Sequence, residues 1–121
     1  MNTSKPLDGR RAVVTGAGSG IGEAIALAYA QAGAQLLLAD IDAARADSVA
    51  RRCRALGAQA ETVIGDVGDE STAHRIIDRC VQAFGGIDIL VNNAGMLTQS
   101  RCADMSLSLI HISEPTRQEA I

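Results

Sequence analysis

Four short apolar runs recur along the chain, separated by longer polar and mixed segments. They occupy residues 11–15, 35–40, 61–64 and 87–91. The run at 35–40 is apolar on both of its alternating faces, which is typical of a strand that helices cover on both sides. The pattern therefore predicts four strands in a buried sheet.

Between these runs, apolar residues recur at the three- and four-residue spacing of amphipathic helices. We expect helices over residues 23–31, around 46–56, and from an N-cap at Asp69 or Ser71 to residue 84, ended by Gly33, Gly57 and Gly85-Gly86. The expected inner faces are Ile21, Ala24, Ile25, Ala28 and Tyr29; then Ala46, Val49, Ala50, Cys53 and Leu56; then Ala73, Ile76, Ile77, Cys80, Val81 and Phe84.

Strands and helices alternate with short connections throughout this region. Right-handed crossovers between successive strands give a parallel sheet with helices on both faces. The expected fold class is therefore α/β, with a doubly wound parallel sheet.

Composition excludes several classes of protein. A chain of 121 residues with a formal net charge of -3 and dispersed arginines has no basic surface for nucleic acid. No run approaches the roughly 20 apolar residues of a membrane span, and the polar start lacks a signal peptide, so we expect a cytoplasmic protein. Cys53, Cys80 and Cys102 lack the close pairing of a metal site, so we expect buried thiols and no metal.

A glycine-rich turn joins the first strand to the first helix. Its glycines stand at Gly16, Gly18, Gly20 and Gly22. Such a turn lets backbone N–H groups approach a pyrophosphate, and the following helix directs its positive end at the same charge. Asp40 ends the second strand, about 20 residues further on, where a carboxylate can bind an adenosine ribose. Together these features predict a dinucleotide site.

Three motifs carry a family resemblance. They are Thr15-Gly16-x-x-x-Gly20-Ile21-Gly22, Asp66-Val67 after the third strand, and Asn92-Asn93-Ala94-Gly95 after the fourth. Over residues 8–106 the chain resembles the short-chain dehydrogenase/reductase family. The resemblance implies a Rossmann-like sheet, here truncated after about four strands.

The same resemblance implies roles for individual residues. The pyrophosphate would be held by Gly16, Ser19, Gly20, Ile21 and Gly22; the adenosine ribose by Asp40; the adenine by Asp66 and Val67; and the nicotinamide ribose by Asn93, Ala94 and Gly95. NADP-using relatives commonly carry a basic residue where Ser19 and Ile41 stand here. Because Asp40 would also repel a 2′-phosphate, we expect NAD in preference to NADP.

The catalytic residues of the family cannot be assigned. Its members use a Ser and a Tyr-x-x-x-Lys pair downstream of the Asn-Asn-Ala-Gly motif, whereas the only tyrosine here is Tyr29 and the only lysine is Lys5. We therefore expect residues 1–106 to be the N-terminal NAD-binding part of the domain, inactive alone. Residues 107–121 resemble a translated sequencing adapter and are expected to be non-native; a genuine divergent terminus is the alternative.

The function implied is NAD-dependent hydride transfer between the cofactor and a small secondary alcohol or ketone. A 3-oxoacyl-carrier-protein reductase is one alternative. A non-catalytic nucleotide-binding module is another, because the catalytic Ser, Tyr and Lys are missing. The resemblance also implies assembly into a homo-oligomer.

Overall fold

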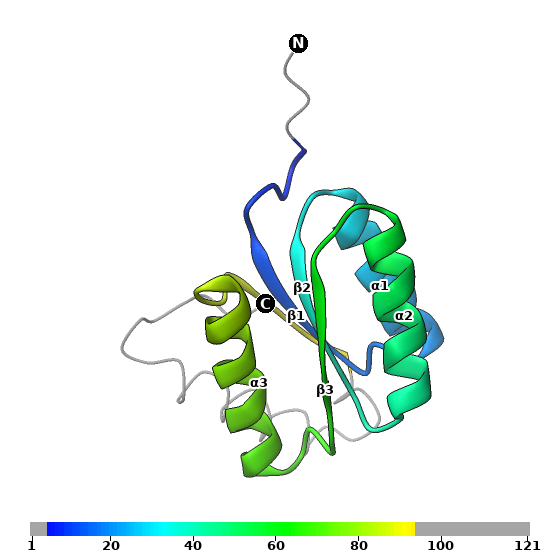
Figure 1. Ribbon diagram of the computed structural model, residues 1–121. Helices are drawn as coiled ribbons and strands as arrows, with labels where there is room; N and C mark the ends of the chain where they lie inside the picture. Colours follow the sequence, from blue (N-terminus) through cyan, green and yellow to red (C-terminus); the bar gives the residue numbers. More distant parts are fainter. Residues whose placement is uncertain (1–4, 94–121) are drawn as a thin grey trace.

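The computed structural model describes residues 5–93 and places seven regular elements in them (Figure 1). In chain order they are β1 (Arg11–Thr15), α1 (Gly20–Gln31), β2 (Gln35–Asp40), α2 (Ala43–Ala55), β3 (Ala60–Ile64), α3 (Glu70–Phe84) and β4 (Ile89–Asn92). Among these described residues no helix is both long and apolar enough to cross a lipid bilayer.

The strands form one parallel sheet in the order β3-β2-β1-β4. β1 lies between β2 and β4, with Val13 level with Leu37 on one side and Leu90 on the other. Figure 1 shows α1 and α2 on one face of the sheet and α3 on the other. The expected α/β class, with a Rossmann-like parallel sheet of about four strands, is confirmed for this part of the chain.

Alternation along β2 divides the core between the two faces. Leu36 and Leu38 pack in the cluster beneath α1 and α2, whereas Leu37 packs in the cluster beneath α3, and all three are fully buried. A strand covered on both sides must be apolar at every central position, which explains the unbroken run in the sequence. The prediction that helices cover both faces of this strand is therefore correct.

The apolar face predicted for α1 is only partly correct. The helix begins at Gly20, three residues before the expected start, and its buried residues are Gly22, Ala26 and Ala30. Ile21 is 60% exposed, and Ala24 and Ala28 are also exposed. The smallest side chains face the sheet because they let the helix axis approach the strands closely, while Ile25 and Tyr29 pack at the sides.

Three smaller predictions also need correction. Leu56 lies at the C-cap of α2, outside the helical stripe, and is 39% exposed. Val81 is 50% exposed because it falls beside, not within, the buried stripe of α3. β4 begins at Ile89, two residues later than expected, and Asp88 just before it donates from its N–H to the carbonyl of Arg11 (2.8 Å).

Two of the cysteines are buried free thiols, as expected: Cys53 on the inner face of α2 and Cys80 on the inner face of α3. Burial raises the pKa of both thiols, that of Cys80 to about 12. Neutral thiols of this kind are poor nucleophiles and poor metal ligands, so they serve as packing. Cys102 lies outside the described residues.

Arg11 and Asp88 fasten the entrance of β4 to that of β1. The Asp88 carboxylate accepts bonds from the Arg11 backbone N–H (2.9 Å), Nε (2.9 Å) and Nη2 (3.1 Å). These bonds hold the pKa of Asp88 below its ordinary value, and the side-chain bond from Arg11 has the largest effect. The pair therefore stabilises the register that brings the end of β4 level with the end of β1.

We expect Asp88→Asn to lower the free energy of unfolding by about 1–2 kcal/mol near neutral pH, after allowance for partial solvent screening. Because the folded-state pKa is lowered, the contribution of the pair is complete above the ordinary value of about 3.9 and is lost as pH falls through the folded value. Urea unfolding between pH 7 and pH 3 measures this dependence. We expect the difference in free energy of unfolding between Asp88→Asn and the parent to become smaller as the pH falls. Asp78→Asn, at an exposed carboxylate on α3, is the control. A gap that stays constant with pH would contradict the assignment.

Candidate functional site

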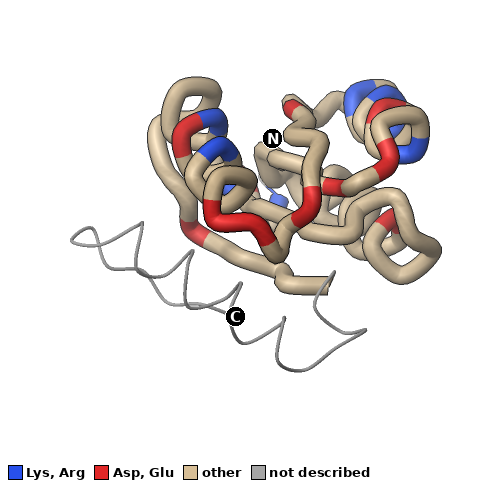
Figure 2. The backbone as a smooth tube through the Cα atoms, turned by 90° about the horizontal axis from the view of Figure 1, so that it is seen from below, with Lys and Arg blue, Asp and Glu red and all other residues tan. Residues whose placement is uncertain are grey.

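The carboxyl ends of the four strands meet at one edge of the sheet, and the predicted binding residues follow those ends. Figure 2 looks at the molecule from this edge and shows Asp and Glu positions distributed around it. In a doubly wound sheet this is the edge at which ligands bind.

Ser19 organises the start of α1. It is the N-cap in extended conformation, and its hydroxyl oxygen accepts from the N–H of Gly22 (3.2 Å) while donating to the carbonyl of Gly16 (2.9 Å). Gly16 adopts φ +64°, a conformation that side chains disfavour. The result is a tight turn that directs the positive end of α1 outward at the sheet edge.

Gly20 and Gly22 differ in what surrounds them. A Cβ on Gly22 would lie 2.0 Å from the Gly16 carbonyl oxygen, so this glycine allows α1 to contact the end of β1 directly. A Cβ on Gly20 would meet no atom within 4 Å. Gly22 is therefore needed for packing, whereas Gly20 leaves open space beside the helix N-terminus.

Asn93 joins the fourth strand to the glycine turn. Its side-chain amide donates to the Gly16 carbonyl (3.2 Å) and to the Ser19 hydroxyl oxygen (3.0 Å). These bonds give Asn93 a direct part in holding the turn, in keeping with the expectation that it steadies the central strands. The contact with a nicotinamide ribose that the resemblance implies stays a prediction. Ala94 and Gly95, the other two residues of that expectation, lie outside the described residues.

Asp40 lies at the end of β2 with its carboxylate fixed by two backbone donors. Oδ2 accepts from the N–H of Gly18 (2.8 Å) and Oδ1 from the N–H of Asp42 (2.8 Å). Each carboxylate oxygen has capacity for a further hydrogen bond. The acid is thus oriented beside the glycine turn and can still accept from hydroxyl groups of a ligand.

The remaining predicted residues lie around the same edge. Ile21 and Ile41 are 60% and 72% exposed, which is unusual for large apolar side chains and leaves them available to contact a ligand. Asp66 accepts from the N–H of Gly68 (2.8 Å) after β3, and Val67 is half-buried against the α3 side of the core. Sheet topology therefore brings all the described candidates to one edge.

One residue of the site was missed. Gly18 falls between the glycines that the motif requires, yet its N–H connects the turn to Asp40, and a Cβ there would lie 2.6 Å from Cβ of Arg45. The sequence contained a signal for it, since Gly18 is the only glycine of the turn that the motif leaves unexplained.

Known proteins resemble this chain in sequence and in structure. The sequence profile of the short chain dehydrogenase family matches residues 10–112. The 7alpha-hydroxysteroid dehydrogenase of Escherichia coli strain K12 is 43% identical over 89 residues, which are 74% of this chain and 35% of that protein. The chain thus spans about a third of the length of this curated relative.

Two solved structures extend the comparison. A 7 alpha-hydroxysteroid dehydrogenase complexed with NADH and 7-oxo glycochenodeoxycholic acid matches with a TM-score of 0.80 and 31% identity, over 95% of this chain and 51% of that one. L-sorbose reductase from Gluconobacter frateurii, complexed with NADPH and L-sorbose, matches with a TM-score of 0.81 and 28% identity, over 93% and 49%. By its profile match, its glycine turn and its parallel sheet, this chain belongs to the short-chain dehydrogenase/reductase family of oxidoreductases, which use nicotinamide cofactors.

Proposed function

We propose that residues 5–93 bind NAD for an oxidoreductase that transfers hydride between this cofactor and a small secondary alcohol or ketone. The observation that carries the proposal is the pair of bonds on Asp40, because the bond from Gly18 makes the glycine turn and the acid parts of one site. A ligand on that site meets backbone N–H groups at one end and a fixed carboxylate at the other. A pyrophosphate linked to a ribose has the matching groups.

The residues divide by the part of the cofactor they would bind. The assignment puts the pyrophosphate on the turn, the adenosine ribose on Asp40, the adenine between the segments after β2 and β3, and the nicotinamide ribose beside the end of β4. By this proposal the pyrophosphate residues are Gly16, Ser19, Gly20, Ile21 and Gly22, the adenine residues are Ile41, Asp66 and Val67, and Asn93 adjoins the nicotinamide ribose.

Charge favours NAD over NADP. Similar structures have been solved with NADH and with NADPH, so the relatives leave both cofactors open. Two unit charges about 4 Å apart at an effective dielectric near 20 repel by ~4 kcal/mol, and solvent reduces that figure. Half of it still corresponds to a preference of about thirtyfold for the cofactor without a 2′-phosphate.

Calorimetric titration of the chain with NAD and NADP tests this proposal without requiring turnover. We expect NAD to bind at least about tenfold more tightly than NADP at moderate salt. Equal affinities, or tighter NADP, would overturn the cofactor assignment. Binding of neither would overturn the dinucleotide site itself.

A further inference from the structure

The outer edge of β3 has main-chain groups that face away from the sheet. Toward β2, the carbonyl of Gln59 accepts from the N–H of Leu36 and the N–H of Gly65 donates to the carbonyl of Asp40. Main-chain direction alternates along a strand, so the backbone groups of Ala60, Thr62 and Ile64 point outward. In the sheet formed by residues 5–93, β3 is an outer strand, and such an edge is a template for another strand.

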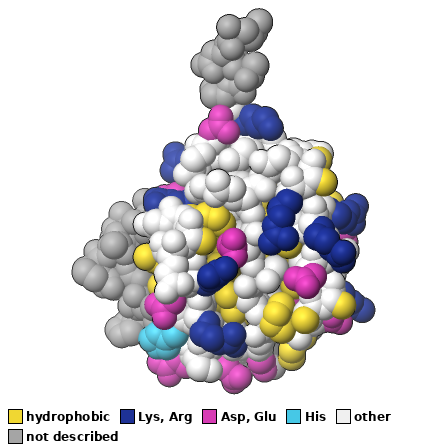
Figure 3. Space-filling view, viewed as in Figure 1, with side chains coloured by type: hydrophobic (Ala, Val, Ile, Leu, Met, Phe, Trp, Pro, Cys, Tyr) yellow, Lys and Arg dark blue, Asp and Glu magenta, His cyan; other side chains and the backbone are white. Residues whose placement is uncertain are grey.

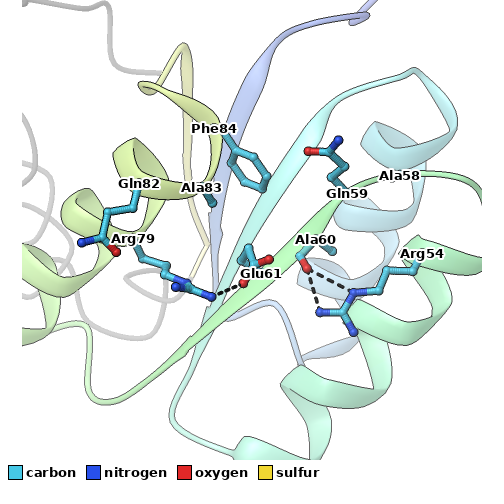
Figure 4. A pocket seen from close by; sticks show the side chains of 9 residues that line it. All are labelled: Arg54, Ala58, Gln59, Ala60, Glu61, Arg79, Gln82, Ala83 and Phe84. Carbon is cyan, nitrogen blue, oxygen red and sulfur yellow. Dashed lines mark hydrogen bonds and ion pairs between the residues drawn. The ribbon is translucent and has the colours of Figure 1, made fainter.

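Two arginines already occupy the outward carbonyls at either end of this strand. Arg54 of α2 donates to the Ala60 carbonyl from Nε (3.2 Å) and Nη2 (2.7 Å), as Figure 4 shows. Arg75 of α3 donates to the Ile64 carbonyl from Nη2 (3.1 Å). The two helices lie on opposite faces of the sheet (Figure 1). One guanidinium therefore reaches the edge of β3 from each face.

Gly65 provides the space for Arg75. A Cβ on Gly65 would lie 2.6 Å from Nη2 of Arg75 and 2.7 Å from the hydroxyl oxygen of Thr72. The backbone at this glycine is not in the left-handed region, so its missing side chain matters for space and not for conformation. The absence of a side chain at Gly65 therefore leaves room for the Arg75 guanidinium at the end of β3.

An open groove of about 480 Å³ adjoins the amino half of the same edge. Its lining includes Arg54, Glu61, Arg79 and Phe84, and Arg79 pairs with Glu61 (Figure 4). Figure 3 shows Lys and Arg side chains together with acidic ones across this front face, between α2 and α3. Both arginines of the groove already contact acceptors of this chain, Arg54 the carbonyl of Ala60 and Arg79 the carboxylate of Glu61.

We propose that Arg54 and Arg75 protect the edge of β3 from pairing with the same edge of a second copy of this chain. Two β3 edges related by a two-fold axis at Thr62 would run antiparallel, so Ala60 of one copy would face Ile64 of the other. Those are the residues whose carbonyls the arginines occupy. Across the same axis, Arg54 of one copy would approach Arg75 of the other, so like charges oppose pairing as well.

The test compares two double variants of the chain with equal charge. Arg54→Ala with Arg75→Ala frees both carbonyls. Arg51→Ala with Arg79→Ala removes one arginine from each of the same helices and leaves the edge carbonyls covered. We expect the first pair to associate at a concentration about tenfold lower than the second, measured by light scattering after size exclusion.

Two further variants keep the test informative if the double variant folds poorly. Gly65→Ala displaces the Arg75 guanidinium without removing a charge, and we expect it to promote association in the same direction. Thr62→Pro removes the N–H at the two-fold axis, which an edge strand tolerates, so adding it to the Arg54/Arg75 pair is expected to restore the parent's association state. Equal association of the two double variants, or association that Thr62→Pro leaves unchanged, would overturn the proposal.

Discussion

Gly22→Ala is expected to weaken nucleotide binding severely and to destabilise the fold. The added methyl would lie 2.0 Å from the Gly16 carbonyl oxygen, 2.8 Å from its carbonyl carbon and 2.9 Å from Nδ2 of Asn93. Two of these atoms are backbone, so α1 must move away from the turn. Overpacking of this kind costs about 2 kcal/mol of stability, and a shift of about 1 Å in a binding turn reduces affinity about a hundredfold.

Gly20→Ala is the matched control, two residues earlier in the same helix. Its methyl meets no atom within 4 Å, so we expect the free energy of unfolding to stay within about 0.5 kcal/mol of the parent. NAD affinity is nonetheless expected to fall about tenfold, because the methyl occupies the space proposed for the pyrophosphate. Urea unfolding and calorimetry on both variants separate the two effects.

Either of two results would contradict this account. If Gly22→Ala kept both stability and affinity, the contact between α1 and the turn would not be required. If Gly20→Ala bound NAD as tightly as the parent, the pyrophosphate would lie elsewhere on the molecule.

The strands were predictable because each apolar run has to be buried on both faces of a parallel sheet. The run at residues 35–40 matches β2 without a shift. The face of α1 was not predictable by choosing the largest apolar residues, since close packing on the sheet selected Gly22, Ala26 and Ala30. In this helix, close approach to the sheet decided which side is buried. The face predicted from hydrophobicity alone is centred about one residue earlier along the helix than the buried one.

The site was predictable as a set of loop residues and not as a set of contacts. Glycine spacing and the position of Asp40 indicate which residues follow β1 and β2. The bonds from Asn93 to the turn require β4 to lie next to β1, and strand order is a property of the folded sheet that local sequence does not specify. The same reasoning applies to Gly18, whose role depends on β2 lying on the other side of β1.

Both ends of β4 are tied to β1, and this explains how a four-residue strand can position Asn93. At the entrance, Asp88 binds Arg11. At the exit, the Thr15 hydroxyl donates to the carbonyl of Val91 (3.3 Å) and lies 3.2 Å from Oδ1 of Asn92. The amide of Asn93 therefore reaches the turn from a strand whose register is fixed at both ends.

Asp40→Asn is expected to change which cofactor the chain prefers. The substitution keeps the size of the side chain, removes the charge that opposes a 2′-phosphate, and leaves one acceptor where two are used. We expect NAD affinity to fall about tenfold through loss of hydrogen bonds to the ribose. Because the repulsion on NADP is relieved at the same time, the ratio of NAD to NADP affinity is expected to fall by about thirtyfold.

The ratio is the informative quantity, since any distortion of the turn by the Asp40→Asn substitution acts on both cofactors and cancels. Asp47→Asn, at an exposed carboxylate on α2, makes the same change in net charge without touching the turn and is expected to leave the ratio within about threefold of the parent, given screening beyond about 10 Å. Calorimetric titration of the parent and both variants with each cofactor, at low and moderate salt, measures the ratio of NAD to NADP affinity. A ratio that Asp40→Asn leaves unchanged, or that Asp47→Asn shifts equally, would mean that the carboxylate at the end of β2 does not lie against the ribose.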